Sequence, residues 1–228
     1  MPEKADLSNI DEAIKLIAPI ISHEVRNPLA IIGNSSYFIK TKLGKDGNVD
    51  AKVERHLGII EMELVHANDV FEKILGYARM PEAKPKAGDL NRMVSDACAA
   101  FKNIKTDLPK AGPNVSADAD LVVRAIKCVV ENAVQAVGGT ETADAQGKVK
   151  VAVKKEGKTG VVSIEDAGPG LSPDCLARLF LPFNTTKPRG IGMGLAYARK
   201  VLDRHKGTVT SEKAKSGAKF KIALPLVL

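Results

Sequence analysis

The first residues in the chain that could do chemistry are a histidine, a carboxylate and an amide close together. They lie in the string His23-Glu24-Val25-Arg26-Asn27-Pro28-Leu29. An imidazole near neutral pH has an unprotonated nitrogen that can attack phosphorus, and a neighbouring carboxylate can accept the proton of the other ring nitrogen. An exposed His-Glu pair alone is more often solvated surface, so the rest of the chain decides between these readings.

Four later motifs have residue types suited to a metal ion and to phosphates. They are Glu131-Asn132-Ala133, Asp166-Ala167-Gly168-Pro169-Gly170, Phe180-Leu181-Pro182-Phe183 and Gly190-Ile191-Gly192-Met193-Gly194-Leu195. Hard cations prefer carboxylate and amide oxygens, and backbone N–H groups of glycines ahead of a helix bind anions. Taken singly each is weak, since the aspartate motif could be a strand-ending turn and the glycines a flexible loop.

In this order, the five motifs resemble the catalytic core of the bacterial two-component sensor histidine kinases, over roughly residues 10–228. The resemblance implies an ATP-dependent protein-histidine kinase that autophosphorylates His23 from Mg-ATP. The phosphoryl group would then pass to an aspartate of a response regulator, which the protein could also dephosphorylate. By the same resemblance, Glu24 and Asn27 join His23 as catalytic residues, with Asn27 orienting a water for dephosphorylation.

Two alternatives remain open at this stage. A dimeric module could dock a response regulator and act mainly as its phosphatase, with little autokinase activity. An ATPase clamp of the mismatch-repair or chaperone type would share the nucleotide motifs, but it gives no reason for the string around His23.

The resemblance also implies a Bergerat-type ATP-binding site with ATP and Mg²⁺ as cofactors. Asp166 would accept a hydrogen bond from the adenine amino group, and Asn132 with Glu131 would hold Mg²⁺. The implied ATP-binding residues are Asn132, Gln135, Asp166, Gly168, Gly170, Thr186, Lys187, Gly190, Gly192, Gly194 and Leu195. The lid over residues 171–190 is short and resembles that of kinases of the nitrogen-regulation type.

Three residues depart from the family pattern. Gln135 stands where some kinases have a phosphate-binding lysine or histidine. Cys128 replaces an additional asparagine, and Asn184 replaces a second phenylalanine in the lid.

Two long helices are predicted to position His23, over residues 10–43 and 50–80, with a turn-rich stretch at 44–48. In the second helix, apolar residues recur at alternating steps of four and three from Val53 to Ala78, which is a heptad seam. The first helix begins similarly with the seam Ile10, Ile14, Ile17 and Ile21. At about 100° per residue His23 lies about 200° from Ile21, so it faces away from this seam. Pro28 should bend the helix.

A lone hairpin of two such helices buries its seam poorly. We therefore expect a homodimer through residues 10–80, in which two hairpins form a four-helix bundle.

Beyond the hairpin, Met80 to Asp89 holds two prolines and a glycine among charged residues and predicts a linker. Helices are then predicted over 90–101, 119–137 and 195–205. Strands are predicted in two hairpins, one over 149–154 and 160–165 and the other over 208–210 and 219–224. The fold class is α+β, with a dimerisation and histidine-phosphotransfer domain (1–80), a linker (81–89) and an α/β sandwich catalytic ATP-binding domain (90–228).

Composition excludes other classes of function. Residues 1–80 carry 10 Lys+Arg against 12 Asp+Glu, whereas residues 81–228 carry 24 against 15, so the excess positive charge lies with the nucleotide motifs. Aromatic residues are only 4% and do not interleave with a basic tract, so we expect no nucleic acid as partner. No apolar run approaches the ~18 residues of a membrane span. Three cysteines without metal-ligand spacing fit a reducing compartment, and we expect a soluble cytoplasmic kinase or a part of a larger one.

Overall fold

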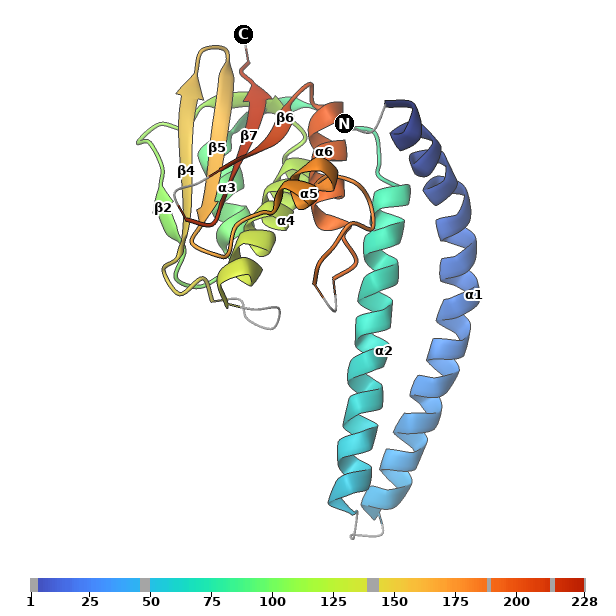
Figure 1. The fold of residues 1–228 in the computed structure, drawn as a ribbon. Coiled ribbons are helices and arrows are strands. Elements are labelled where there is room, and N and C mark those ends of the chain that lie inside the picture. The colour runs from blue at the N-terminus through green and yellow to red at the C-terminus, as the bar shows by residue number, and fades with distance from the viewer. Residues whose placement is uncertain (1–3, 46–49, 139–143, 188–189, 214–215, 228) are drawn as a thin grey trace. The chain divides into compact units, whose positions relative to one another are not determined.

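The computed structural model describes residues 4–45, 50–138, 144–187, 190–213 and 216–227. The chain divides into two compact units, with the boundary between Met80 and Pro81. The N-terminal unit is a helical hairpin, and the C-terminal unit is a mixed sheet with helices on one face (Figure 1). The predicted fold class of helices followed by an α/β domain is confirmed. Part of the predicted turn, residues 46–48, lies outside the described residues.

The hairpin consists of α1 (Lys4–Lys45) and α2 (Ala51–Ala78). The Asp50 carboxylate caps the N-terminus of α2 by accepting a hydrogen bond from the Lys52 N–H at 2.7 Å. Helix α1 runs through Pro19 and Pro28 as one continuous, curved helix (Figure 1). None of the described helices is long and apolar enough to span a membrane.

Only part of the predicted α1 seam packs inside the hairpin. Ile14 and Ala18 are buried, as is Leu57 of the predicted α2 seam. Ile10, Ile17 and Ile21, which are predicted to share the seam of Ile14, are 39–48% exposed in the single hairpin. Helix α1 is rotated so that the neighbouring stripe, which includes Ile14, Ala18 and the partly buried Leu29, faces α2.

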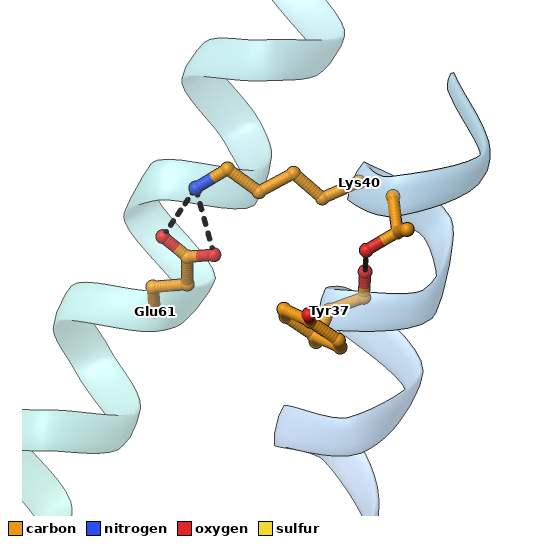
Figure 2. Close-up of polar contacts among 4 residues, drawn as sticks. Tyr37, Lys40 and Glu61 are labelled. Carbon is orange, nitrogen blue, oxygen red and sulfur yellow. Dashed lines mark hydrogen bonds and ion pairs between the residues drawn. The ribbon is translucent and has the colours of Figure 1, made fainter. Parts of the chain in front are cut away.

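Polar contacts between the helices set their register. The Arg26 guanidinium lies 2.6 Å from a Glu72 carboxylate oxygen. Farther along, the Lys40 ammonium donates to both Glu61 oxygens at 2.9 and 3.0 Å (Figure 2). Each pair is about half exposed and contributes at most about 1 kcal/mol, so the contacts specify alignment more than stability.

The larger sheet of the C-terminal unit has the order β2-β4-β5-β7-β6. Its strands are β2 (Lys105–Asp107), β4 (Val149–Glu156), β5 (Thr159–Asp166), β7 (Ala218–Pro225) and β6 (Thr208–Lys213). Strand β2 runs parallel to β4, and all other neighbours are antiparallel. Both predicted hairpins are confirmed. A small sheet of β1 (Lys86–Asp89) and β3 (Asn114–Ala117) was not predicted, because strands this short show no clear alternation.

Three helices line one face of the larger sheet: α3 (Leu90–Cys98), α4 (Ala119–Gly138) and α6 (Gly194–Arg204). Strand β7 alternates strictly, and its fully buried residues Phe220, Ile222 and Leu224 face this helical layer. From α4, Ile126 and Val130 fill the same core. Figure 1 shows α4 and α6 together on this face, and the short helix α5 (Pro173–Arg178) lies in the chain between β5 and α6.

The predicted linker is largely attached to the C-terminal unit. Its last four residues form β1 and pair with β3. The Lys84 N–H donates to Asp118 Oδ2 at 3.0 Å, and the Arg204 guanidinium donates to the Pro81 carbonyl. The sequence predicts free chain over 81–89, but from Lys84 onward the backbone is held by its own domain.

His205, predicted only as a residue at the end of a helix, is the C-cap of α6 and is also buried. Its Nε2 accepts the Asp118 N–H at 2.9 Å, and its Nδ1 lies 2.7 Å from the Val201 carbonyl oxygen. The tautomer with the proton on Nδ1 satisfies both contacts. His205 therefore joins the end of α6 to the residue that precedes α4.

We expect His205→Ala to lower the free energy of unfolding of the C-terminal unit by about 2–4 kcal/mol. The substitution leaves a cavity and an unpaired buried N–H on Asp118. Urea denaturation measures the loss, and hydrogen exchange of the α4 and α6 amides localises it. His56→Ala, at an exposed position of α2, is the matched control and should change stability by less than about 0.5 kcal/mol. Equal effects of the two substitutions would contradict this role of His205.

Candidate functional site

Asp166 lies at the end of β5 and faces the helical layer. It follows Val162 and Ile164 at the two-residue period of the strand, and it is only 3% exposed. Its Oδ1 accepts hydrogen bonds from the N–H groups of Gly168 at 2.9 Å and Ala218 at 3.2 Å. Both of these bonds use the same oxygen, so Oδ2 is the one that can accept a hydrogen bond from a ligand.

Burial raises the pKa of the Asp166 carboxyl, and the hydrogen bonds from Gly168 and Ala218 oppose that rise. The neighbouring Glu165 raises the pKa further, whereas Lys187 lowers it. The fixed N–H donors therefore favour the ionised, accepting form of the carboxyl group, against the effect of burial.

The glycines around Asp166 permit close backbone packing. A Cβ on Gly168 would lie 2.9 Å from the Ala136 carbonyl oxygen of α4. Gly170 has φ +80°, and a Cβ there would lie 3.1 Å from the Gly217 carbonyl oxygen. Gly217 has φ +74° and packs directly against Asp166. The loop after β5 thus fits between α4 and the start of β7.

Helix α4 presents a partly exposed polar stripe beside its buried face. Glu131, Asn132 and Gln135 lie on this stripe, since residues three and four apart share a helix face. The Gln135 side-chain amide donates to Glu131 Oε1 at 3.4 Å, which turns Gln135 Oε1 away from α4's own carboxylate. The stripe therefore offers carboxylate and amide oxygens to a cation.

Lys187, from the lid, contacts this stripe directly. Its Nζ donates to Asn132 Oδ1 at 2.9 Å and to Gln135 Oε1 at 2.6 Å. Burial lowers the pKa of the Lys187 ammonium, while the charges of Glu131 and Asp166 oppose that shift. Asn132, Gln135 and Lys187 are thus brought together, with two carboxylates close enough to stabilise the positive charge.

The three glycines before α6 pack against the lid and α4. A Cβ on Gly190 would lie 2.5 Å from Thr185 Oγ1, and one on Gly192 would lie 2.5 Å from backbone atoms of Asn184. Gly194 begins α6 and lies beside Cys128.

The remaining residues of the predicted nucleotide site and lid make fewer contacts with the polar groups described above. Asn184 donates to the Arg178 carbonyl oxygen at 2.8 Å and so ties the lid to the end of α5. Thr186 is exposed and Leu195 is partly buried in the first turn of α6. Residues 188 and 189 of the predicted lid lie outside the described residues.

The oxygens on α4 suit a magnesium ion that is shared with a ligand. They already accept hydrogen bonds from a cationic group, and carboxylate and amide oxygens are the donors Mg²⁺ prefers. Within the described ranges, no three His, Cys, Asp or Glu side chains cluster as a metal site. A site with one or two protein oxygens that is completed by water and phosphates is the usual arrangement for Mg²⁺.

In the N-terminal unit, His23 is largely exposed. Its side chain is 77% exposed, and its Nδ1 lies 3.6 Å from Glu24 Oε1. Asn27 is also exposed, one helical turn farther along α1. Arg26, from the same string, binds Glu72 and so anchors this turn to α2.

Comparison with known families places the C-terminal part of the chain. Residues 117–228 match the family described as histidine kinase-, DNA gyrase B- and HSP90-like ATPases. Sensor histidine kinase ZraS of Klebsiella oxytoca is 28% identical over 224 residues, which cover 94% of this chain and 46% of that protein. Residues 117–228 therefore match an ATPase domain of this family, and the chain as a whole is similar in sequence to sensor histidine kinases.

Further relatives show the same similarity. The nitrogen regulation protein NtrY of Azorhizobium caulinodans is 26% identical over 92% of this chain and 28% of that protein. The chain thus spans about half or less of the length of the curated relatives it matches. In fold, it is similar to full-length ShkA in complex with AMPPNP, with a TM-score of 0.69, 20% identity, and coverage of 92% of this chain and 45% of that one.

Sequence reasoning did not find Gly217 and Ala218, which hold Asp166 in place from the far end of the chain. Gly217 and Ala218 stand where β7 begins, and nothing local in the sequence links them to Asp166. The pairing of β5 with β7 creates the link, because it brings the start of β7 beside the end of β5.

We expect Gly217→Ala to impair both stability and ATP binding, whereas Gly157→Ala serves as a matched control. Both glycines have positive φ, but a Cβ on Gly217 would lie 2.6 Å from Asp166 Oδ1 and closer still to its backbone, whereas nothing lies within 4 Å at Gly157. Gly157→Ala should cost about 1 kcal/mol of stability through backbone strain alone.

Gly217→Ala should lower the free energy of unfolding by at least about 2 kcal/mol, because Asp166 must shift. For the same reason it should weaken the affinity for ATP about tenfold or more. Urea denaturation and calorimetric titration with ATP measure the two effects. Unchanged ATP affinity in the folded Gly217→Ala protein would show that Gly217 does not position Asp166 for binding.

Proposed function

We propose that this chain is a histidine kinase that transfers the γ-phosphoryl group of Mg-ATP to His23 and then to an aspartate of a response regulator. The observation that carries the proposal is the accessible His23–Glu24 pair in the same chain as the Asn132–Gln135–Lys187 cluster. The first group is suited to accept a phosphoryl group, and the second is suited to bind the phosphates and metal of a nucleotide.

In this proposal, the C-terminal unit selects and holds ATP. Asp166 Oδ2 accepts a hydrogen bond from the adenine amino group, and Gly168 and Gly170 let the base approach the backbone. Asn132, with Glu131, holds Mg²⁺, which would neutralise phosphate charge when bound. Thr186 and Lys187 approach the phosphates from the lid, and the N–H groups around Gly192 and Gly194 bind their oxygens at the start of α6.

The reaction at His23 follows from the placement of Glu24. If Nδ1 carries the proton and gives it to Glu24, Nε2 has the lone pair that attacks phosphorus. The new P–N bond forms as the bond from the γ-phosphorus to the bridging oxygen breaks, and ADP leaves. The carboxylate of Glu24 lies at ion-pair distance from Nδ1, which supports this assignment of roles.

A response regulator is the proposed partner. A related fold, with a TM-score of 0.65 and 23% identity over 92% of this chain and 61% of that one, is kinase ThkA in complex with response regulator protein TrrA. Asn27 is exposed on the face of α1 near His23, where a docked partner could reach both residues. We also propose that Asn27 orients water during dephosphorylation, and that the reaction takes place in the cytoplasm, where ATP is supplied.

We further propose that the chain forms a homodimer through its hairpin. Five exposed isoleucines lie on α1 within an arc of about 60°, at 100° per residue. They are Ile10, Ile17, Ile21, Ile32 and Ile39, each 39–48% exposed. This isoleucine stripe adjoins the face that packs on α2, so a second hairpin could cover it. His23 lies about 150° from the centre of the stripe, and it would stay accessible in the dimer.

We expect Ile17→Glu to convert the dimer to a monomer, because it places a charge in the isoleucine stripe. Leu16→Glu is the matched control, since Leu16 is 72% exposed and lies about 130° from the centre of the stripe. Sedimentation velocity gives the mass of each protein, and far-UV circular dichroism checks that the helices remain. A wild-type monomer, or equal dissociation by both substitutions, would refute the proposed interface.

We expect His23→Gln to abolish incorporation of label from γ-labelled ATP while ATP binding is retained. In the wild type, the label should be lost in acid and stable in alkali, as a phosphoramidate is. His56→Gln, at an exposed position on α2, should label like the wild type. Label that survives in His23→Gln would overturn the proposal.

The alternative function, a docking module that acts mainly as a phosphatase, gives a different result. It predicts little label on the wild type, together with dephosphorylation of a phosphorylated regulator that depends on Asn27.

A further inference from the structure

Lys187 and three side chains of α4 form a continuous chain of polar contacts. From Glu131 Oε1 the chain passes to the Gln135 amide, from Gln135 Oε1 to the Lys187 ammonium, and from that ammonium to Asn132 Oδ1. The two partners of Gln135 fix the orientation of its amide, because its nitrogen donates to a carboxylate and its oxygen accepts from an ammonium. Gln135 is therefore placed to guide the lysine rather than to bind phosphate itself.

The lysine ammonium and a metal ion cannot use Asn132 together. The ammonium lies 2.9 Å from Asn132 Oδ1. A Mg²⁺ ion bound to the same oxygen would lie at about 2.0–2.1 Å from it and would repel a neighbouring ammonium strongly. The two cations therefore represent alternative occupants of one subsite.

We propose that Lys187 is an internal counter-cation that occupies the metal subsite before Mg-ATP binds, and that Gln135 is the positioning residue that holds it there. This inference rests on the proposed function of Asn132 as the metal ligand. The held lysine keeps the lid against α4 and offsets the charge of Glu131. When metal and nucleotide bind, the ammonium leaves Asn132 and becomes free to approach the phosphates.

The backbone around Lys187 supports a defined position for its side chain. The Lys187 N–H donates to Thr185 Oγ1 at 3.1 Å, and the Lys187 carbonyl accepts from the Gly190 N–H at 3.0 Å. Gly190 packs against both Thr185 and the Lys187 Cβ, where a larger residue would collide. The Lys187 backbone is thus held by hydrogen bonds at both its N–H and its carbonyl group.

A double-mutant cycle on lid protection tests the role of Gln135. Hydrogen exchange is measured over residues 179–187 of the nucleotide-free protein in the wild type, Gln135→Leu, Lys187→Met and the double variant. Each single change should speed exchange about tenfold, since each removes a hydrogen bond to a charged group. The double variant should be no faster than Lys187→Met, because Gln135 acts through the lysine. Additive effects, or no effect of Gln135→Leu, would overturn the proposal.

Mn²⁺ alone tests the competition for the subsite. Electron paramagnetic resonance should show several-fold tighter Mn²⁺ binding to Lys187→Met than to the wild type, since the competing ammonium is gone. Lys154→Met removes an exposed lysine of β4 and should bind Mn²⁺ like the wild type. Equal Mn²⁺ affinity for all three proteins would refute the competition. Neither measurement needs phosphoryl transfer, so failure of the proposed kinase activity would show separately, as absence of label on His23.

Discussion

The packing of α4 on the sheet is the constraint on which the rest of the site depends. Its buried face, with Ile126, Val129 and Val130 fully covered, fixes the rotation of the helix about its axis. Once that rotation is fixed, Asn132 and Gln135 must point toward the lid, because they lie on the adjoining stripe. The same rotation sets the backbone of Ala136 against Gly168. The proposed metal ligands and the loop of the proposed adenine site thus take their positions from one apolar contact surface.

The polar groups of the site are balanced so that burial is tolerated. Burial raises the pKa of the Asp166 carboxyl while two backbone N–H groups oppose that rise, and burial lowers the pKa of the Lys187 ammonium while two carboxylates oppose that shift. Removing either partner of a buried, charged contact leaves the other uncompensated, which costs more than the contact itself contributes. Substitution of Gln135 or Lys187 alone is therefore expected to cost more stability per residue than substitution of both together.

The local sequence pattern was enough to predict the long helices and both hairpins of the larger sheet. It could not predict which α1 stripe packs inside the hairpin, because Ile10 and Ile14 are equally apolar and lie only about 40° apart on the helix. Nor could it show that Gln135, a departure from the family pattern, would contact Lys187 of the lid. Contacts such as Ala218 to Asp166 join residues 52 positions apart and arise only when β5 pairs with β7.

The attachment of the linker limits where the two units can move. A flexible hinge over all of residues 81–89 would allow large changes in the orientation of the two units. The pairing of β1 with β3 and the Lys84–Asp118 hydrogen bond, however, hold the later part of that segment. Arg204 holds the Pro81 carbonyl, and the adjacent His205 fixes Asp118, so the end of α6 controls both attachment points. If the chain acts as the proposed kinase, the motion that brings nucleotide to His23 must arise near Arg79 and Met80, or it must first break these contacts. Helix α6 also begins at the glycines of the proposed nucleotide site, so one helix joins that site to the contacts that hold the linker.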